Sequence, residues 1–365
     1  MHSSLIKPSV QSQKAALNSI LTKAPNYTEA ECQFTTLLAV ENLDNNLESY
    51  SYIKESFEAT LAAALTVAYY DSYKAESAHL FLQRVLYRIN RLKLFWYDDL
   101  THYQNERSLY LQSIQHRIED AWQAWELSQL NVEQLKQLDV HQALSDRAAA
   151  DLEPEPSATG RYLSHEMTEA GYRRVLEIAS LDGLVEASQL SRTLGGVANE
   201  VSSVLTRLMV EEYGAGKLSR KHSTYFTTML SELGMNTEPE AYLDQVPWEV
   251  LATINHSFLL SERKRFFLRY VGGLLYTEIS VPSSFSPYQA AGERLGLSKE
   301  AIAYWSLHIK VDILHGRWML DEVALPLVNQ YPVNAWELVL GYDQQKWMGD
   351  RAGEAVVLAA RRAER

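Results

Sequence analysis

The sequence has 365 residues, of which 46% are hydrophobic and 22% are charged, and its formal net charge is −12. This composition is typical of a folded globular protein and excludes a disordered or fibrous chain. The length admits two domains or one large helical body, and the negative charge argues against nucleic acid as the main partner.

Three features bear on the compartment of the protein. The single cysteine, Cys32, excludes an intramolecular disulfide and any cysteine-rich metal site, and it fits a reducing cytosol. The segment 1–23 lacks the continuous apolar core of a signal peptide. The longest apolar run, 59–70, is shorter than the roughly 20 residues that span a bilayer. We therefore expect a cytoplasmic protein without a membrane span.

The first 159 residues contain no glycine, so one of the two strongest helix breakers is absent from this long stretch. Apolar residues recur there at three- and four-residue spacing, which predicts helix hairpins. We expect residues 1–145 to form a helical accessory region that covers the rest of the protein or makes a homodimer contact. Small, acidic and proline residues then dominate 146–160, which we interpret as a linker before a second helical domain at 161–365.

Helices are also predicted throughout the second domain, where no segment shows the sustained alternation of a strand. Glycine and proline mark where these helices should end. The predicted helices cover 201–213, ending at Gly214; 218–233, ending at Gly234; 261–279, ending before Pro282; and a stretch from Lys299 toward Pro326, capped by Ser298.

The last of these helices carries His308, Asp312 and His315 at positions i, i+4 and i+7. At 3.6 residues per turn the three side chains share one helix face, so two imidazoles and a carboxylate point into the same space. Two histidines and one carboxylate are a ligand set of non-haem iron, although a hydrogen-bonded cluster on the helix face is an equal alternative.

Three further helices offer metal-capable groups to the same interior. They carry the neighbouring carboxylates Glu211 and Glu212, the imidazole of His222, and Glu278 at the end of an apolar segment. A buried carboxylate needs a cation, a proton or water beside it. Taken singly, a solvated helix end is the commoner explanation for Glu211 and Glu212.

Several residues close to these groups are candidates for a substrate pocket or for contacts to the ligands. They are Tyr213, Tyr276, Tyr304, Trp305, Asn255 and His256. Core packing is the competing interpretation for each of the aromatic residues.

The ordered set of motifs resembles a known family. Glu212-Tyr-Gly-Ala-Gly, His222 and Leu233-Gly234, then Glu278, Pro287-Tyr288 and Leu295-Gly296-Leu297, and finally His308, Asp312 and His315 are similar to the signature of the haem-oxygenase-like di-iron oxidases and oxygenases, also called iron-containing redox enzymes. The resemblance covers residues 162–340.

This resemblance implies an all-α, haem-oxygenase-like helical bundle that binds two Fe ions and no haem. The implied ligands are Glu212, His222, Glu278, His308, Asp312 and His315. It also implies a di-iron oxidase or oxygenase, ferrous before it meets O2, that acts on a small amino-acid or fatty-acid type substrate by oxidative decarboxylation, carbon–carbon cleavage or N-oxygenation. One departure concerns spacing. Ten residues separate Glu212 from His222, where some members have seven, so the choice between Glu211 and Glu212 stays open.

Two other functions compete with this one. A non-catalytic helical binding or scaffold protein would use the same residues as a structural polar network, and a true haem oxygenase would need one axial histidine. Iron and manganese are both compatible with the ligand types. No Gly-x-Gly-x-x-Gly fingerprint follows a strand, so we expect the reductant to come from outside, for example from an electron-donor protein.

Overall fold

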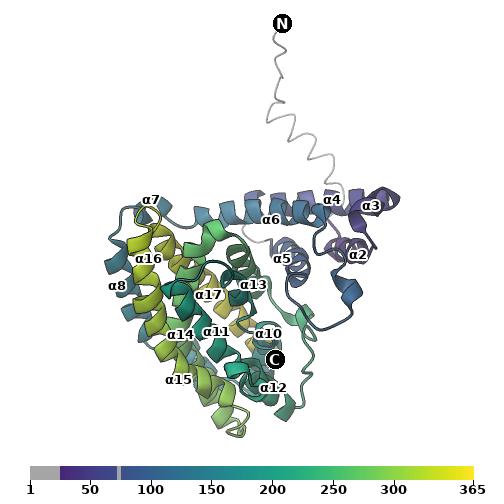
Figure 1. Cartoon of the computed structure of the whole chain (residues 1–365). Coiled ribbons are helices and arrows are strands. Elements are labelled where there is room, and N and C mark those ends of the chain that lie inside the picture. The colour runs from purple at the N-terminus through teal and green to yellow at the C-terminus, as the bar shows by residue number, and fades with distance from the viewer. Residues whose placement is uncertain (1–24, 72–74) are drawn as a thin grey trace. The chain divides into compact units, whose positions relative to one another are not determined.

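A computed structural model of the chain describes residues 25–71 and 75–365, and Figure 1 shows how its helices are arranged. Every regular element within these residues is a helix, so the predicted all-α fold is confirmed. None of the helices described is both long and apolar enough to cross a bilayer. The chain divides into two compact units, and the division falls after Trp122.

The first unit has a hydrophobic core of its own. Its elements are α2 (Tyr27–Leu38), α3 (Leu43–Asn46), η1 (Leu47–Tyr50), α4 (Ser51–Thr66), η2 (Val67–Asp71), α5 (Glu76–Arg91), η3 (Leu100–Tyr103) and the first part of α6 (Leu109–Ser128). Phe34, Phe57 and Phe81, from α2, α4 and α5, are fully buried, with ring centroids 5.1 and 6.2 Å apart. These aromatic contacts hold the three helices together.

The second unit contains all the candidate metal ligands. Its elements, after the end of α6, are α7 (Val132–Leu135), α8 (Val140–Leu152), α9 (Ala158–Arg161), η4 (Tyr162–Glu166), α10 (Glu169–Gly183), η5 (Ser188–Thr193), α11 (Glu200–Glu212), η6 (Gly214–Gly216), η7 (Leu218–Arg220), α12 (His222–Glu232), η8 (Leu243–Gln245), α13 (Trp248–Glu262), η9 (Lys264–Phe266), α14 (Phe267–Arg294), α15 (Ala303–Arg317), η10 (Trp318–Ala324), α16 (Leu325–Gln330) and α17 (Trp336–Ala363).

The division of the chain lies earlier than the linker expected at 146–160. Helix α8 runs through the first half of that segment and belongs to the second unit. Two hydrogen bonds of 2.6 and 2.9 Å join Arg147 on α8 to Asp343 on α17. Asp151 accepts two more from α17, at 2.9 and 2.7 Å. These contacts explain why residues with a linker-like composition are helical here.

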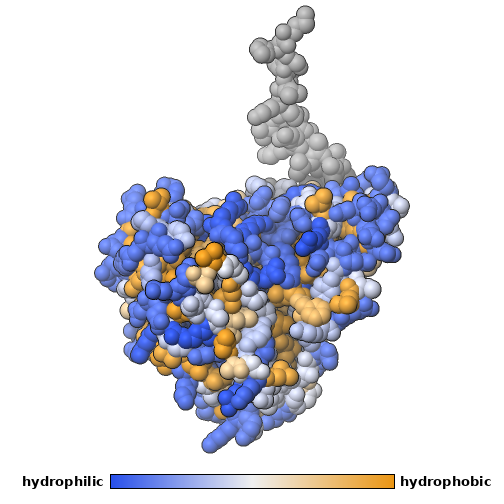
Figure 2. Space-filling model, in the orientation of Figure 1, coloured by the Kyte–Doolittle hydropathy of each residue, from blue (hydrophilic) through white to orange (hydrophobic). Residues whose placement is uncertain are grey.

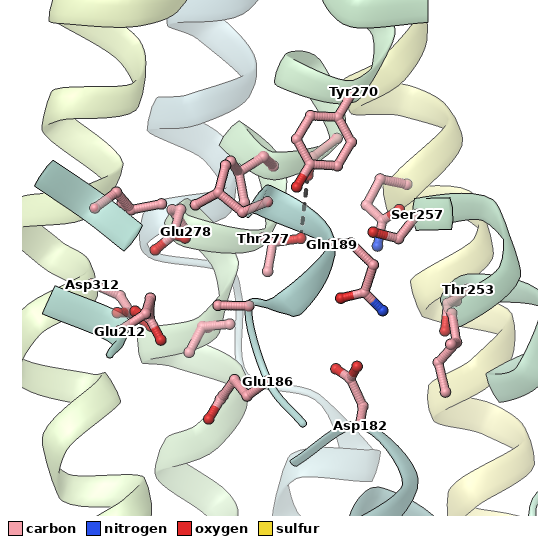
Figure 3. A pocket seen from close by; sticks show the side chains of 18 of the residues that line it. Asp182, Glu186, Gln189, Glu212, Thr253, Ser257, Tyr270, Thr277, Glu278 and Asp312 are labelled. Atoms are coloured by element: carbon pink, nitrogen blue, oxygen red, sulfur yellow. Dashed lines mark hydrogen bonds between the residues drawn. The ribbon is translucent and has the colours of Figure 1, made fainter. Parts of the chain in front are cut away.

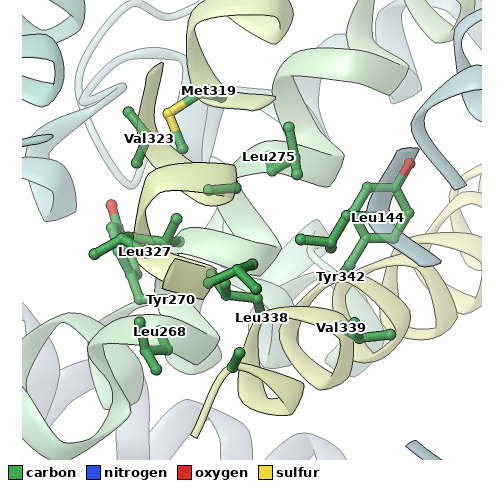
Figure 4. Close-up of a cluster of buried hydrophobic side chains, with 14 of the residues drawn as sticks. Leu144, Leu268, Tyr270, Leu275, Met319, Val323, Leu327, Leu338, Val339 and Tyr342 are labelled. Carbon is green, nitrogen blue, oxygen red and sulfur yellow. The ribbon is translucent and has the colours of Figure 1, made fainter. Parts of the chain in front are cut away.

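The core of the second unit lies around α14 and α17, which pack along each other (Figure 4). Leu275 on α14, Leu338 and Val339 on α17, and Met319 and Val323 on η10 are fully buried in it. On the face shown in Figure 2, hydrophobic residues lie among hydrophilic ones. Inside, the buried contacts between α14, α17 and η10 hold in place the helices that carry the candidate ligands.

Two glycines allow α14 and α17 to approach each other closely. A Cβ atom added to Gly272 on α14 would lie 1.9 Å from the carbonyl oxygen of Leu338 on α17, and one added to Gly341 would lie 2.0 Å from that of Arg269. Both clashes are with backbone atoms, which cannot swing away as a side chain can. A close helix crossing, rather than a flexible hinge, therefore accounts for these glycines.

Three predicted helices are found with shifted ends. The helices expected at 201–213 and 218–233 are α11 and α12, and Gly214 and Gly234 follow them with φ of 61° and 65°. The helix expected from Lys299 begins at Ala303, because Ser298 caps a short turn before it through a 3.1 Å hydrogen bond from the amide of Ala301.

The prediction for 261–279 was wrong at both ends. Ser261 lies near the end of α13, and α14 continues through Pro282 and Pro287 to Arg294. A proline within a helix costs about 3 kcal/mol, yet α14 packs against both α15 and α17 along its length. The hydroxyl of Ser286 also donates to the carbonyl of Pro282 at 2.8 Å. Tertiary packing therefore outweighs the local helix-breaking signal.

The crossing of α14 and α17 gives the first testable prediction. We expect Gly341→Ala to lower the free energy of unfolding by roughly 1–3 kcal/mol, because its methyl group overlaps the backbone of α14. In the same helix, Gly353 has nothing within 4 Å of an added Cβ, so Gly353→Ala should stabilise by about 0.5–1 kcal/mol through helix propensity. Thermal unfolding followed by circular dichroism compares the two, and equal effects would contradict the close crossing.

Candidate metal centre

Helix α15 presents His308, Asp312 and His315 on one buried face, as their spacing predicts. The exposed fractions of the three residues are 4%, 3% and 0%. Groups of this polarity are rarely so buried without partners, so what they face decides what they do.

Glu212 and His222 meet this face from two other helices. Glu212 is the last residue of α11, and His222 is the first of α12. Between them the chain folds back on itself, so that a Cβ on Gly214 would lie 2.4 Å from the backbone of Arg220. His222 Nδ1 consequently lies 2.8 Å from Glu212 Oε2. The longer spacing of ten residues therefore still lets the two side chains converge, from different helices.

One set of ligand atoms converges at the α10 side of α15. In this first group, Glu186, Glu212, His222 and His308 each offer an atom within 4.8 Å of the others. His308 Nε2 lies 3.1 Å from Glu186 Oε1 and 3.1 Å from His222 Nδ1. Two imidazole nitrogens so close together need a proton or a metal ion between them.

A second set lies about one turn further along α15. In this second group, Glu212, Asp312 and His315 meet within 4.8 Å of one another. Glu278, from α14, has its Oε2 atom 3.3 Å from His315 Nδ1, and Asp312 Oδ1 lies 3.2 Å from the same nitrogen. Glu212 is common to both groups, and it is the residue that connects them.

Residues behind the two imidazoles fix their orientation. His308 Nδ1 lies 2.7 Å from the backbone carbonyl of Tyr304, and His315 Nε2 lies 3.0 Å from Glu211 Oε2. A carbonyl and a carboxylate can only accept, so each of these nitrogens carries the proton. The opposite nitrogens, Nε2 of His308 and Nδ1 of His315, are thereby directed at the carboxylates.

Glu211 and Glu212 occupy different environments. The side chain of Glu212 is only 8% exposed and points into both groups, whereas that of Glu211 is 43% exposed and reaches the outer nitrogen of His315. Glu212 therefore has the position of a ligand, and Glu211 has the position of a residue that orients one.

The concentration of charge shifts the pKa values of these groups. Burial, together with the carboxylates of Asp312 and Glu212, raises the pKa of Glu278 to about 7. Burial alone would lower the pKa of His308, but Glu186 and its neighbours raise it to about 10. Asp312 and Glu278 likewise outweigh the effect of burial on His315 and raise its pKa to about 11. Protons therefore compensate the carboxylates here, as a cation would.

Several polar atoms in this cluster lack a hydrogen-bond partner among the residues that the structure describes. Glu186 Oε2, Asp312 Oδ1 and His315 Nδ1 are buried in this state. The contact of 3.2 Å between Asp312 and His315 lacks hydrogen-bond geometry. Leaving such atoms unsatisfied is costly, and a metal ion bound by carboxylate oxygen and imidazole nitrogen would satisfy all three. The donor set therefore fits iron.

Glu186 was missed in the sequence analysis. It lies in the turn after α10, where a single glutamate is most often solvated. Its hydrogen bond from the hydroxyl of Tyr304, 2.7 Å long, and its contact with His308 place it in the first group. No local signal marks it, because its contacts come from other helices, and those with Tyr304 and His308 lie more than a hundred residues away in the chain.

The other candidates for a pocket divide between the site and the core. Tyr304 contacts Glu186 and lines the cavity described below. His256 on α13 also lines this cavity. Asn255 is buried beside His256, whereas Trp305 donates to the hydroxyl of Tyr172 at 2.8 Å within an aromatic cluster. Tyr276 packs edge to face against Tyr342, and Tyr213 packs under Lys221. These last residues do not line the cavity.

A cavity of about 260 Å³ opens beside the cluster (Figure 3). Glu212, Glu278 and Asp312 lie together on one side of it, with Glu186 next to them. Across the open space are Asp182, Gln189, Thr253 and Ser257. A small molecule in this cavity would be in contact with the ligand atoms.

Comparison with known proteins supports the resemblance found in the motifs. Residues 173–345, which include all seven residues of the cluster, match the family described as iron-containing redox enzyme. Nitrosourea synthase from Streptomyces achromogenes subsp. streptozoticus is 29% identical over 150 residues, or 41% of this chain. The match covers 32% of that relative, so the chain spans about a third of its length. The predicted family is confirmed for this part of the chain.

The different positions of two adjacent glutamates give a second prediction. We expect Glu212→Ala to lose Fe(II) from both groups, because Glu212 belongs to both. Glu211→Ala should keep its iron content and bind it on the order of 10–100-fold more weakly, because only the orientation of His315 is lost. Iron content after anaerobic loading, and competition with a chelator, measure the two effects. Loss of iron from Glu211→Ala alone would reverse the assignment.

Proposed function

We propose that this protein, whose residues 173–345 match the iron-containing redox enzymes, is a non-haem di-iron oxidase or oxygenase that uses O2 to oxidise a small organic substrate. The observation that carries the proposal is that Glu212 belongs to two adjacent groups of buried ligand atoms. A carboxylate with one oxygen for each of two ions is the usual bridge in helical di-iron centres.

In this proposal each group holds one ion. Glu186, His222 and His308 would hold the first ion, Asp312, His315 and Glu278 would hold the second, and Glu212 lies within reach of both. The set differs from the six ligands implied by the sequence only by the addition of Glu186. When bound, the two ferrous ions would supply electrons to O2.

Charge compensation supports two ions rather than one. Two Fe(II) ions carry four positive charges, and the carboxylates of Glu186, Glu212, Asp312 and Glu278 carry four negative charges. With neutral imidazoles the centre is electrically balanced, which a buried site requires. A single divalent ion would leave two carboxylates to be compensated by protons.

The chain's own residues prepare the site for this chemistry. The hydroxyl of Tyr304 donates to Glu186, and burial raises the pKa of this phenol well above its ordinary range, so it stays a donor at neutral pH. A substrate in the cavity would lie beside Glu186, Glu212 and Glu278. Electrons for repeated turnover would come from a donor outside the chain.

Among the three reaction types of the family, we favour oxidation at nitrogen. The relative is named for making a nitrosourea, a product with an oxidised nitrogen, and its match with this chain covers 41% of the chain. The alternatives of a scaffold protein and of a haem oxygenase fit less well. A scaffold would leave the carboxylates to be compensated by protons alone, and a haem oxygenase needs one axial histidine and would leave the carboxylates without a role.

The direct test is anaerobic titration with Fe(II), followed by exposure to O2. We expect about two Fe(II) per chain and rapid oxygen consumption, watched by Mössbauer spectroscopy and an oxygen electrode. Asp312→Ala should remove iron from the second group and abolish the fast reaction. As a control, Asp321→Ala changes an exposed aspartate outside the cluster and should behave as the native protein. Folded native protein that binds no iron would overturn the proposal.

Metal binding should also depend on pH. His308 and His315, with pKa values of about 10 and 11, are protonated at neutral pH in the metal-free protein, and each must lose its proton to bind iron. Loading at pH 8 should therefore release about two protons per chain, and affinity should fall as pH is lowered. Below pH 7 Glu278, with a pKa of about 7, adds a third proton. An indicator dye measures the protons released on loading. Equal affinity for Fe(II) at pH 8 and pH 6 would contradict the prediction.

A further inference from the structure

One carboxylate in the cavity belongs to neither group of candidate ligands. Asp182 is the penultimate residue of α10, and Figure 3 shows its side chain directed into the open space on the side away from Glu212 and Asp312. It is accessible from the cavity, and it makes no side-chain hydrogen bond or ion pair with the residues that the structure describes. Its charge therefore faces whatever occupies the cavity.

The one lining residue whose raised pKa makes it a cation in the metal-free protein, His308, lies against Glu186 among the candidate ligands. Among the residues that surround the cavity there is no lysine and no arginine. The polar ones on the side of Asp182 are uncharged: Gln189, Thr253, Ser257 and Thr277. The negative end of the α10 dipole adds to the field at Asp182, because this residue is in the last turn of the helix.

Two bound metal ions would not neutralise Asp182 either. Glu186, Glu212, Glu278 and Asp312 carry as much negative charge as two Fe(II) ions carry positive charge, so the ions leave no surplus positive charge for Asp182. Burial and the nearby Glu186 raise the pKa of Asp182 to about 6, so its charged form carries a free-energy cost, although the side chain is exposed to the cavity. At neutral pH a cation in the cavity would relieve that cost.

We propose that the substrate is a small organic cation, with an ammonium, amidinium or guanidinium group held by Asp182 and the rest of the molecule facing the metal centre. This inference rests on the proposed function and names the substrate class of the same site. It disfavours fatty acids, because their carboxylate would find no lysine or arginine in the lining.

The test compares the binding of four probes of similar size to protein loaded with Fe(II) under anaerobic conditions. The probes are n-butylammonium, n-butylguanidinium, neutral butyramide and anionic butyrate, titrated by calorimetry. We expect the two cations to bind at least about tenfold more tightly than butyramide, and butyrate to show no binding. The preference between the two cations separates an ammonium from a guanidinium substrate.

Variants assign the preference to Asp182. Asp182→Asn should weaken the binding of both cations by about tenfold or more and leave butyramide unchanged, while Asp182→Glu should keep part of the preference. Asp321→Asn removes the same charge from an exposed position outside the cavity and should bind all four probes as the native protein does. Circular dichroism and iron content establish that each variant is folded and loaded.

The outcomes separate this inference from the proposed function. If native protein and Asp182→Asn both hold two irons and bind the cations equally well, the role of Asp182 is overturned and the di-iron proposal stands. The same holds if Asp321→Asn weakens the cations as much as Asp182→Asn does, because the preference would then be a long-range effect. If the native protein holds no iron, the proposed function fails and this inference fails with it.

Discussion

The cost of burying carboxylates is the constraint on which the second unit depends. Four carboxylates lie close to the imidazoles of His222, His308 and His315 in the interior of this unit. They belong to Glu186, Glu212, Glu278 and Asp312. Such an arrangement is unfavourable unless positive charge is supplied, by protons or by metal ions. The raised pKa values of His308 and His315 indicate that protons on these imidazoles supply the positive charge in the metal-free chain. Iron would replace those protons, so stability and metal binding are linked at the same atoms.

The helices can bring these groups together only because small residues remove obstacles between them. Gly272 and Gly341 let α14 and α17 cross closely, which fixes the position of α14 one and a half turns before Glu278. Gly316 follows His315 directly, and a Cβ there would lie 2.9 Å from Ile279 and 3.3 Å from the carbonyl of Glu278. The approach of α14 to α15 at this point lets the carboxylate of Glu278 reach His315. The ligand geometry is therefore set by backbone contacts as much as by the ligands themselves.

Sequence periodicity was enough to predict the part of the site that lies on one helix. His308, Asp312 and His315 share a face because of the 3.6-residue repeat, and glycines correctly marked the ends of α11 and α12. Glu186 could not be found in this way, because its role depends on distant partners. The end of α14 was misplaced for a related reason. Proline is a local signal, whereas the packing that overrides it involves α15 and α17.

The position of Tyr304 shows how one residue couples the two ends of the first group. Its backbone carbonyl accepts from His308 Nδ1 and so directs Nε2 toward Glu186, while its own hydroxyl donates to that same glutamate. Because Tyr304 and His308 are four residues apart on α15, the helix itself fixes both contacts. An imidazole and a carboxylate from different parts of the chain are thus oriented by a single residue. Glu186 Oε2, which has no hydrogen-bond partner within residues 25–71 and 75–365, stays available for a metal ion. Helix α15 therefore fixes the imidazole of this pair, and through the hydroxyl of Tyr304 it also holds Glu186, which comes from the turn after α10.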